Sequence, residues 1–529
     1  SNLDVIDVDG AANFAADVTF ADGADIITAS AGTSNFRAGV NAGNSIASGG
    51  NYNVVVGDEA GTAITTGDLM TAVGYKALFT EDTGERSTAV GAYALTLQNS
   101  AVENYNTAVG YNAGGAVTTG IKNTLVGGLA GDSLTDADNN TAIGYLALSA
   151  DTLGSKSTAI GQGTLFAQNF TSATDAFNTA VGYLAGTAVT TGTHNTFIGG
   201  LAGDANTTGY YNVAVGASAL SANTTAISNT AVGYASLTAN TTGANNVALG
   251  ANALQPNTTG ASNTAVGFSA LDANTTGGQN VAVGDNALGA NTTADYNTAL
   301  GTSTLQLNTT GVNNVATGAF SLTANTTGDN NVAMGYQALK SNTTADNNTA
   351  IGDQALEFNT TGANNVALGA LALDANTTGD DSVAIGYQAL GANTTGGGNI
   401  AIGSGALDAN TTAVHNVGVG TNALGGNTTG TANVALGHRA LLTNSTADNN
   451  TAVGYDSLKL NTTGASNVAL GKHSLFANTT GSENTALGLG AGEKLTTGVN
   501  NILIGYVAGA HDVYLTTGIG NVIIGNYAD

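Results

Sequence analysis

The fold is decided by the stretch Asn229-Thr230-Ala231-Val232-Gly233-Tyr234-Ala235-Ser236-Leu237-Thr238-Ala239-Asn240-Thr241-Thr242-Gly243-Ala244-Asn245, after which Asn246-Val247-Ala248-Leu249-Gly250 starts the same pattern again. The pattern is N-[TV]-A-[VIL]-G-x-x-A-L-x-x-N-T-T-[GA]-x-x, which is 17 residues long. Its first glycine recurs every 17 residues without a break from Gly216 to Gly505, and the units outside this run bring the total to 28. A constant short period of this kind indicates a repeat architecture.

Each unit predicts two short strands and two turns. In Thr230-Ala231-Val232 the side chains alternate, so Thr230 and Val232 share one face and Ala231 takes the other. Gly233 and the stretch 240–243 are rich in turn residues, and the short run around Leu237 lies between them. No stripe with a 3.6-residue period is present, which excludes helical repeats.

A constant period without an intervening helix predicts an all-β protein, a parallel β-helix or β-roll solenoid of about 28 coils. We expect aliphatic side chains such as Val232, Leu237 and Leu249 to stack into an inner column. Asparagines that recur at one coil position are expected to form a ladder in which side-chain amides bond from coil to coil. The ladder residues are Asn240, Asn257, Asn274 and Asn291.

A coil of 17 residues encloses only a thin core, and this suggests that the chain associates with copies of itself. The small side chains of Ala231, Ala248 and Ala265 recur at fixed spacing on the face opposite the aliphatic column. We expect this alanine stripe to be buried against another chain, and cyclic symmetry would repeat the contact around a rod. A homotrimer, intertwined or side by side, is the predicted assembly.

The composition excludes several classes of function. Only 9% of the 529 residues are charged, the net charge is −26, and there are 10 Lys and Arg, 5 His and no Cys. Nucleic-acid binding needs clustered basic residues, and membrane insertion needs an apolar run of about 20 residues, so neither is expected. We predict no enzyme, no catalytic residue, no cofactor and no metal site. Asp272, Asp374 and Asp408 occupy similar coil positions but are too far apart for adjacent carboxylates.

The units Asn212–Gly216 and Ser382–Gly386, with the intervening A-L-x-x-N-T-T-G, resemble two related repeat groups. One is the head of trimeric autotransporter adhesins, whose units contain N-S-V-A-I-G. The other is the bacteriophage tail-fibre repeat, in proteins that often end in an intramolecular chaperone, and it is the more similar because it shares Gly-Tyr and N-T-T-G. The resemblance covers about residues 50–529 and implies a trimeric β-roll rod that presents binding surfaces to a cell.

Two regions follow from this comparison. Residues 51–529 are predicted to form the solenoid rod. Residues 1–50 are predicted to form an N-terminal β segment like a connector, since 3–10 and 17–23 resemble the short acidic strand-turn segments that precede such rods in phage fibres. The implied location is extracellular, either on a virion as a tail fibre or on a cell surface.

Recognition residues are sought where the pattern fails and where aromatic residues recur. Solenoid insertions form loops, and binding residues favour loops. Three loops, 98–105, 168–177 and 508–514, contain the candidate receptor contacts Tyr105, Phe170, Phe177 and Tyr514. A second candidate is a stripe of tyrosines that follow the repeat glycine, whose role is either packing against the next coil or chain or facing a receptor. These tyrosines are Tyr75, Tyr111, Tyr145, Tyr183, Tyr234, Tyr336, Tyr387 and Tyr455.

The sequence therefore predicts a structural fibre or adhesin rod, first of all a phage tail fibre that attaches to a host cell. Its partners would be copies of itself and a glycan or protein receptor on the cell surface. The alternatives are a bacterial trimeric adhesin head, a self-assembling extracellular filament and, more remotely, an ice-binding solenoid. Against the last, adjacent threonines such as Thr241 and Thr242 point to opposite sides of an extended chain.

Overall fold

The computed structural model describes residues 31–510 and 515–529, and no helix occurs among them. The chain divides into two compact units: the first comprises 1–160 with 169–175, and the second comprises 161–168 with 176–529. Both are parallel β-solenoids with a period of 17 residues, and together they have 29 turns. This is one turn of the solenoid more than expected. The stretch 36–39, Phe-Arg-Ala-Gly, lacks the repeat motif but supplies the strand of an additional turn, which pairs with the strand that follows.

The first unit contains one three-residue strand per turn and one extra pair of short strands. Its strands are β1 (Phe36–Ala38), β2 (Val54–Val56), β3 (Thr71–Val73), β4 (Thr88–Val90), β5 (Thr107–Val109), β6 (Thr124–Val126), β7 (Thr141–Ile143), β8 (Gly154–Ser155), β9 (Thr158–Ile160) and β10 (Thr174–Asp175). Strands β1 to β7 and β9 pair in chain order, all parallel, while β8 pairs with β10. Strand β1 lies within the predicted N-terminal segment 1–50, and residues 1–30 of that segment lie outside the described part of the chain.

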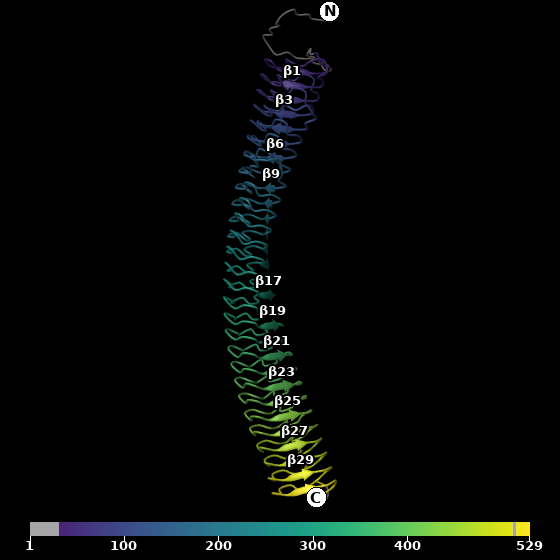
Figure 1. Cartoon of the computed structure of the whole chain (residues 1–529). Coiled ribbons are helices and arrows are strands. Elements are labelled where there is room, and N and C mark those ends of the chain that lie inside the picture. Colours follow the sequence, from purple (N-terminus) through teal and green to yellow (C-terminus); the bar gives the residue numbers. More distant parts are fainter. Residues whose placement is uncertain (1–30, 511–514) are drawn as a thin grey trace, which may run out of the picture. The chain divides into compact units, whose positions relative to one another are not determined.

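The second unit has the more regular sequence and pairs its 21 strands in chain order (Figure 1). They are β11 (Thr179–Val181), β12 (Thr196–Ile198), β13 (Val213–Val215), β14 (Thr230–Val232), β15 (Val247–Leu249), β16 (Thr264–Val266), β17 (Val281–Val283), β18 (Thr298–Leu300), β19 (Val315–Thr317), β20 (Val332–Met334), β21 (Thr349–Ile351), β22 (Val366–Leu368), β23 (Val383–Ile385), β24 (Ile400–Ile402), β25 (Val417–Val419), β26 (Val434–Leu436), β27 (Thr451–Val453), β28 (Val468–Leu470), β29 (Thr485–Leu487), β30 (Ile502–Ile504) and β31 (Val522–Ile524). Equivalent residues face each other, as in the pair Ala231 and Ala248.

The prediction of two strands per turn is wrong. The backbone around Leu237 is not extended but reverses direction, because Leu237 has a φ of 51° and lies in the left-handed region. The Leu237 N–H donates to the carbonyl of Ala253, so this part of the chain still hydrogen-bonds to the next coil of the solenoid. Tight winding of the 17-residue coil therefore leaves room for a single strand of three residues.

The assignment of the two strand faces is also wrong. Ala231 is completely buried inside the coil, whereas Val247 and Leu249 of the next strand are 38% and 46% exposed. Leu237 is buried, as predicted. The interior beside the strand is so narrow that a methyl group fills it, and the branched side chains at the first and third strand positions lie on the outer face of the sheet.

The repeat glycine is required by the glycine of the next turn. Gly233 has a φ of 136°, a region that residues with a Cβ rarely adopt. A Cβ atom on Gly233 would lie 2.5 Å from the carbonyl oxygen of Gly250, and the same contact recurs along the column. The close approach of successive backbones therefore explains why the glycine returns in each turn.

Buried asparagines form two ladders beside the core. In the second unit, Asn240 Nδ2 donates to Asn223 Oδ1 at 3.0 Å and to the Gly243 carbonyl at 2.9 Å. The other predicted ladder residues continue this arrangement, with Nδ2 to Oδ1 distances of 3.0, 2.9 and 2.9 Å for Asn257, Asn274 and Asn291. A second ladder, absent from the prediction, is formed by the asparagine that precedes each strand of the second unit except β23, where the residue is Ser382; the Asn246 N–H, for example, donates to Asn229 Oδ1 at 2.9 Å. Because these amides are hydrogen-bonded, apart from Asn478 Oδ1 at the end of the first ladder, their burial does not carry the cost of unsatisfied polar groups.

A few turns fill the interior differently. In the turn of β12, Phe197 takes the place of the strand alanine and Gly203 takes the place of the leucine. A Cβ atom on Gly203 would lie 2.5 Å from the Phe197 ring, and one on Gly186 of the preceding turn would lie 2.8 Å from it. Leu125 with Gly131 in the first unit repeats the exchange. The large side chain thus occupies the volume that the missing side chains vacate.

Candidate functional site

The predicted receptor contacts lie in different environments. Tyr105 and Phe177 are 49% and 46% exposed, as a contact residue should be. Phe170 is 5% exposed, so its proposed role as a receptor contact is wrong. Its ring lies 2.7 Å from the position a Cβ of Gly154 would occupy, and it therefore packs on the turn below the insertion. Tyr514 lies outside the described residues.

Buried carboxylates hold the first two insertions in place. Glu81 is fully buried and accepts hydrogen bonds from Gln98 Nε2 at 2.7 Å and Asn104 Nδ2 at 3.1 Å, both in the loop 98–105. Asp151 is also fully buried and accepts from the Phe170 N–H at 3.2 Å. Both acids stand at the coil position that asparagine occupies in the regular turns. A carboxylate therefore takes the place of the ladder asparagine next to the inserted residues.

All eight tyrosines of the predicted stripe are more than 40% exposed. They do not form one continuous row of ring contacts. Tyr75 and Tyr111 are linked only through Tyr93, at centroid distances of 5.3 and 6.1 Å. The residue after the repeat glycine is not aromatic in many of the intervening turns, as with Gln162 and Ala217, so the stripe consists of single tyrosines and a few short clusters.

A separate aromatic patch lies in the second unit and was not predicted as a group. In three successive turns, the residue just before the asparagine that precedes the strand is aromatic or His: Phe177, His194 and Tyr211. Their ring centroids are 5.1 and 5.0 Å apart, and Tyr210 meets Tyr211 edge-on at 5.2 Å. Arranging the sequence in rows of 17 would have found it, because stacking brings residues one period apart into contact.

The outer face of the second unit's sheet is a long apolar strip. The third strand position is occupied by Val, Leu, Ile or Met in each strand except β19, where it is Thr317, and the first position by Thr, Val or Ile. No charged residue occurs at either position. About 20 steps of 4.8 Å and three residues of 3.3 Å make a strip of roughly 95 by 10 Å.

A row of threonines runs along another side of the same unit. At the position of the second threonine of N-T-T, a threonine recurs every 17 residues from Thr191 to Thr497, and it is exposed in each turn. The first threonine is half-buried, and in most turns its hydroxyl donates to the threonine carbonyl of the next turn, as Thr241 does to Thr258 at 3.0 Å. The two threonines of a pair therefore have different surroundings.

Two carboxylates that the sequence placed too far apart converge on one gap. A Cβ atom on Gly391 would lie 2.9 Å from Asp408 Oδ1 and 3.6 Å from Asp374 Oδ1, so the two acids flank the turn that lacks a side chain. Burial raises the pKa of the Asp374 carboxyl, and the charges of Glu357 and Asp408 raise it further. Burial likewise raises the pKa of Asp408. Glu357 pairs with Lys340 at 3.3 Å.

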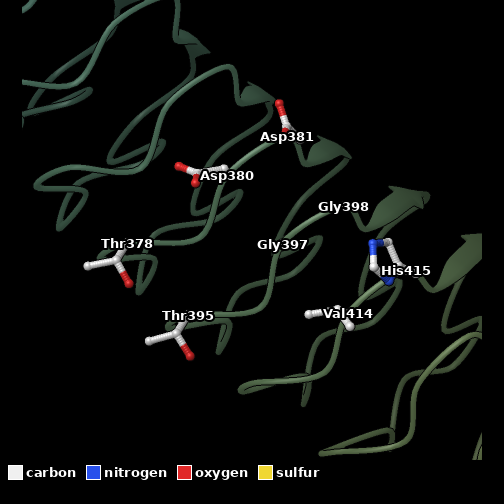
Figure 2. A pocket seen from close by; sticks show the side chains of 8 residues that line it. All are labelled: Thr378, Asp380, Asp381, Thr395, Gly397, Gly398, Val414 and His415. Carbon is white, nitrogen blue, oxygen red and sulfur yellow. The ribbon is translucent and has the colours of Figure 1, made fainter.

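A shallow groove of about 490 Å³ opens in the second unit beside Gly397 and Gly398, the last two of three consecutive glycines (Figure 2). It is lined by Thr378, Asp380, Asp381, Thr395, Gly397, Gly398, Val414 and His415. His415 lies over Gly398, whose Cβ would be 2.8 Å from its ring. The carboxylates of Asp380 and Asp381 accept hydrogen bonds from the preceding turn, at 2.7 and 3.2 Å. The groove is therefore a gap in two side-chain rows rather than a set of converging groups.

Comparison with known proteins does not assign the chain to a family. No protein-family model matches the sequence, and no curated protein is similar to it. Over the described ranges, no helix is long and apolar enough to span a membrane. Within the same ranges, His, Cys, Asp and Glu residues do not gather in a group of three or more that could hold a metal ion.

Proposed function

We propose that this protein is a structural fibre or adhesin rod, a phage tail fibre in the first instance, which forms a homotrimer and attaches to a cell surface outside the cell. The observation that carries the proposal is the apolar strip on the outer face of the second unit's sheet. Soluble monomers rarely expose contiguous apolar patches of more than a few hundred Å². The strip of roughly 95 by 10 Å compares with the ~800 Å² per partner that stable interfaces bury.

The apolar strip, rather than the alanine stripe expected from the sequence, would form the interface of the trimer. The alanine stripe cannot be the interface, because the strand alanines are buried within their own chain. Valine, leucine and isoleucine at the third strand position offer more apolar area, and the equal register of the strands lets copies align along the whole unit. A cyclic trimer would bring three such strips to a common axis.

Sedimentation equilibrium of the full chain tests the assembly. The expected mass is three times that of the 51.6 kDa chain. Replacing Leu249, Leu300 and Leu436 with lysine should break the trimer, because charge would be buried at the interface. The matched control replaces the exposed Thr242, Thr293 and Thr429 with lysine and should leave the trimer intact. A monomeric parent chain would overturn the proposal.

Attachment is tested separately from assembly. A fluorescently labelled trimer should bind intact bacterial cells of its host in flow cytometry, and several weak contacts per trimer would raise the apparent affinity through avidity. Cells that bind the control carrying the three threonine-to-lysine changes but not the variant with lysine on the strip would link attachment to the trimer. Equal binding by both would show that attachment does not need the assembly.

The exposed threonine row favours one second candidate, an ice-binding solenoid. A regularly spaced row of identical hydroxyl-bearing side chains could order water on one side of the unit. The experiment is a thermal-hysteresis measurement on the full chain, in which ice binding predicts a gap between melting and freezing temperatures. Zero hysteresis would remove this candidate.

A further inference from the structure

Basic residues gather at one place in this acidic chain. Arg439, Lys459, Lys472 and Lys494 lie within four successive turns, although the whole chain has only 10 Lys and Arg. The stacking of turns brings three of them, Arg439, Lys459 and Lys472, to the neighbouring residues Tyr455 and Asp456. These four basic residues balance the four acids of the same turns, Asp448, Asp456, Glu483 and Glu493, whereas the whole chain has a net charge of −26.

Tyr455 lies at the centre of this group. Its ring centroid is 5.4 Å from the Arg439 guanidinium and 5.6 Å from Lys472 Nζ, within the range of cation–π attraction. His438 stacks on the ring at 5.4 Å and His473 lies at 5.9 Å. We call these residues, together with Asp456, Lys459 and Phe476, the Tyr455 cluster.

One buried carboxylate holds the cluster together. Asp456 is 4% exposed, pairs with Arg439 Nε at 2.9 Å and with Lys459 Nζ at 3.3 Å, and Arg439 also donates to the Tyr455 hydroxyl at 2.7 Å. A single carboxylate thus faces two permanent cations, and Lys472 adds a third that is exposed. Glu493 Oε1 lies 3.8 Å from His473 Nδ1. The cluster therefore carries excess positive charge.

We propose that the Tyr455 cluster binds a carboxylate or sulfate group of an acidic polysaccharide. Lys472 and His438 are exposed and would meet the anion, while Arg439 and Lys459 are fixed by Asp456 and supply a positive background. The half-exposed rings of Tyr455 and Phe476 offer apolar surface beside these charges, which suits a sugar ring. A polysaccharide with separated charges fits better than a nucleic acid, because the dense phosphates of nucleic acid would be repelled by the rest of the chain.

The identity of the polymer as a cell-surface glycan rests on the proposed function, but the binding chemistry does not. The test is biolayer interferometry of the full chain with dextran sulfate, polygalacturonate and neutral dextran at low salt. We expect binding to at least one acidic polymer and none to neutral dextran. The two acidic polymers distinguish sulfate from carboxylate, and the binding should weaken as salt is raised.

Matched variants locate the binding. Lys472→Gln should weaken binding by roughly two- to fivefold, the range expected for an exposed charge contact, and His438→Gln, which removes the ring stacked on Tyr455, should weaken it by a similar or smaller factor. Lys122→Gln, which removes another exposed lysine, in the first unit, should have no effect. Circular dichroism would verify that each variant is folded.

Three results would overturn the inference: no binding to either acidic polymer, equal losses for Lys472→Gln and Lys122→Gln, or tighter binding to single-stranded DNA than to either acidic polymer. The outcome is independent of assembly and attachment. A chain that is monomeric yet binds through Lys472 would contradict the proposed function alone, and a trimer that fails to bind would contradict this inference alone.

Discussion

The turns of β14 and β12 enclose the same space with opposite choices of side chain. In the turn of β14, the strand contributes only the methyl group of Ala231 to the interior, and Leu237 fills the rest from the other side of the coil. In the turn of β12, the Phe197 ring fills the interior from the strand, and Gly203 on the opposite side of the coil has no side chain. What the two turns share is the total volume and the repeat glycine. A solenoid of this width therefore constrains the sum of its interior side chains rather than each position by itself.

Replacing the repeat glycine, which the two turns share, should have the largest effect on stability. Gly199→Ala and Gly233→Ala should each destabilise their own turn by more than about 3 kcal/mol, because the φ region is nearly closed to alanine and the new Cβ would meet the next backbone. Hydrogen exchange at the amides of the altered turn is the measurement. Gly289→Ala is the control, since its Cβ would have no contact closer than 3.4 Å. Equal protection in all three variants would contradict this account of the glycine.

The exchange of volume can be tested directly on Phe197 and Gly203. Phe197→Ala alone should cost about 3–5 kcal/mol by leaving a cavity. Gly203→Leu alone should cost about 1–3 kcal/mol, because the leucine would overlap the ring. The double variant has the alanine and leucine of the β14 turn and should recover part of the loss, although the space beside Gly186 stays empty. Additive losses in denaturant unfolding would show that the two positions do not share one volume.

The smallest effect is expected for the acids beside Gly391. Asp374, Gly391 and Asp408 occupy the same coil position in three successive regular turns. The folded chain binds a proton at Asp374 more tightly than the unfolded chain does, because burial raises the pKa of Asp374. Ionisation at neutral pH therefore weakens the fold, and stability should rise as the pH falls through the folded pKa, with the full gain below the unfolded value of about 3.9.

Asp374→Asn should consequently raise the thermal midpoint at pH 7 by an amount equivalent to about 0.5 kcal/mol or less, and the gain should vanish near pH 3. Asp285→Asn is the control, since Asp285 is exposed. A lower midpoint for Asp374→Asn at pH 7 would show that the carboxylate stabilises the turn after all.

The period alone was enough to predict the solenoid, the parallel pairing and the buried leucine. It could not decide which strand face is inside. Alternation groups Thr230 with Val232, but the usual expectation that larger aliphatic residues are buried fails when the interior accepts only the methyl group of Ala231. The choice depends on the cross-section of the coil, which is set by the left-handed turn at Leu237, and no pattern in one unit reveals that conformation.

Site prediction succeeded or failed for a related reason. An aromatic residue in an insertion was taken as exposed, yet Phe170 covers a turn while Phe177, in the same loop, is exposed. The Tyr455 cluster was missed, apart from Tyr455 itself, because its members are spread over 39 residues from His438 to Phe476. Only the stacking of turns makes neighbours of residues one period apart.

The ladder of Asn206 to Asn478 gives the second unit an electrical direction, although none of its described residues is helical. Each Nδ2 donates to the Oδ1 of the preceding turn, from Asn223 onto Asn206 through to Asn478 onto Asn461, so the amide dipoles add head to tail. The N–H ends face the N-terminal turns and the oxygen ends face the C-terminal turns, which is the polarity of an α-helix macrodipole. The series stops where Leu495 replaces asparagine, and the buried Oδ1 of Asn478 has no hydrogen-bond partner there. The two ends of the ladder thus differ in the sign of their partial charge, and stacked amides alone produce the difference.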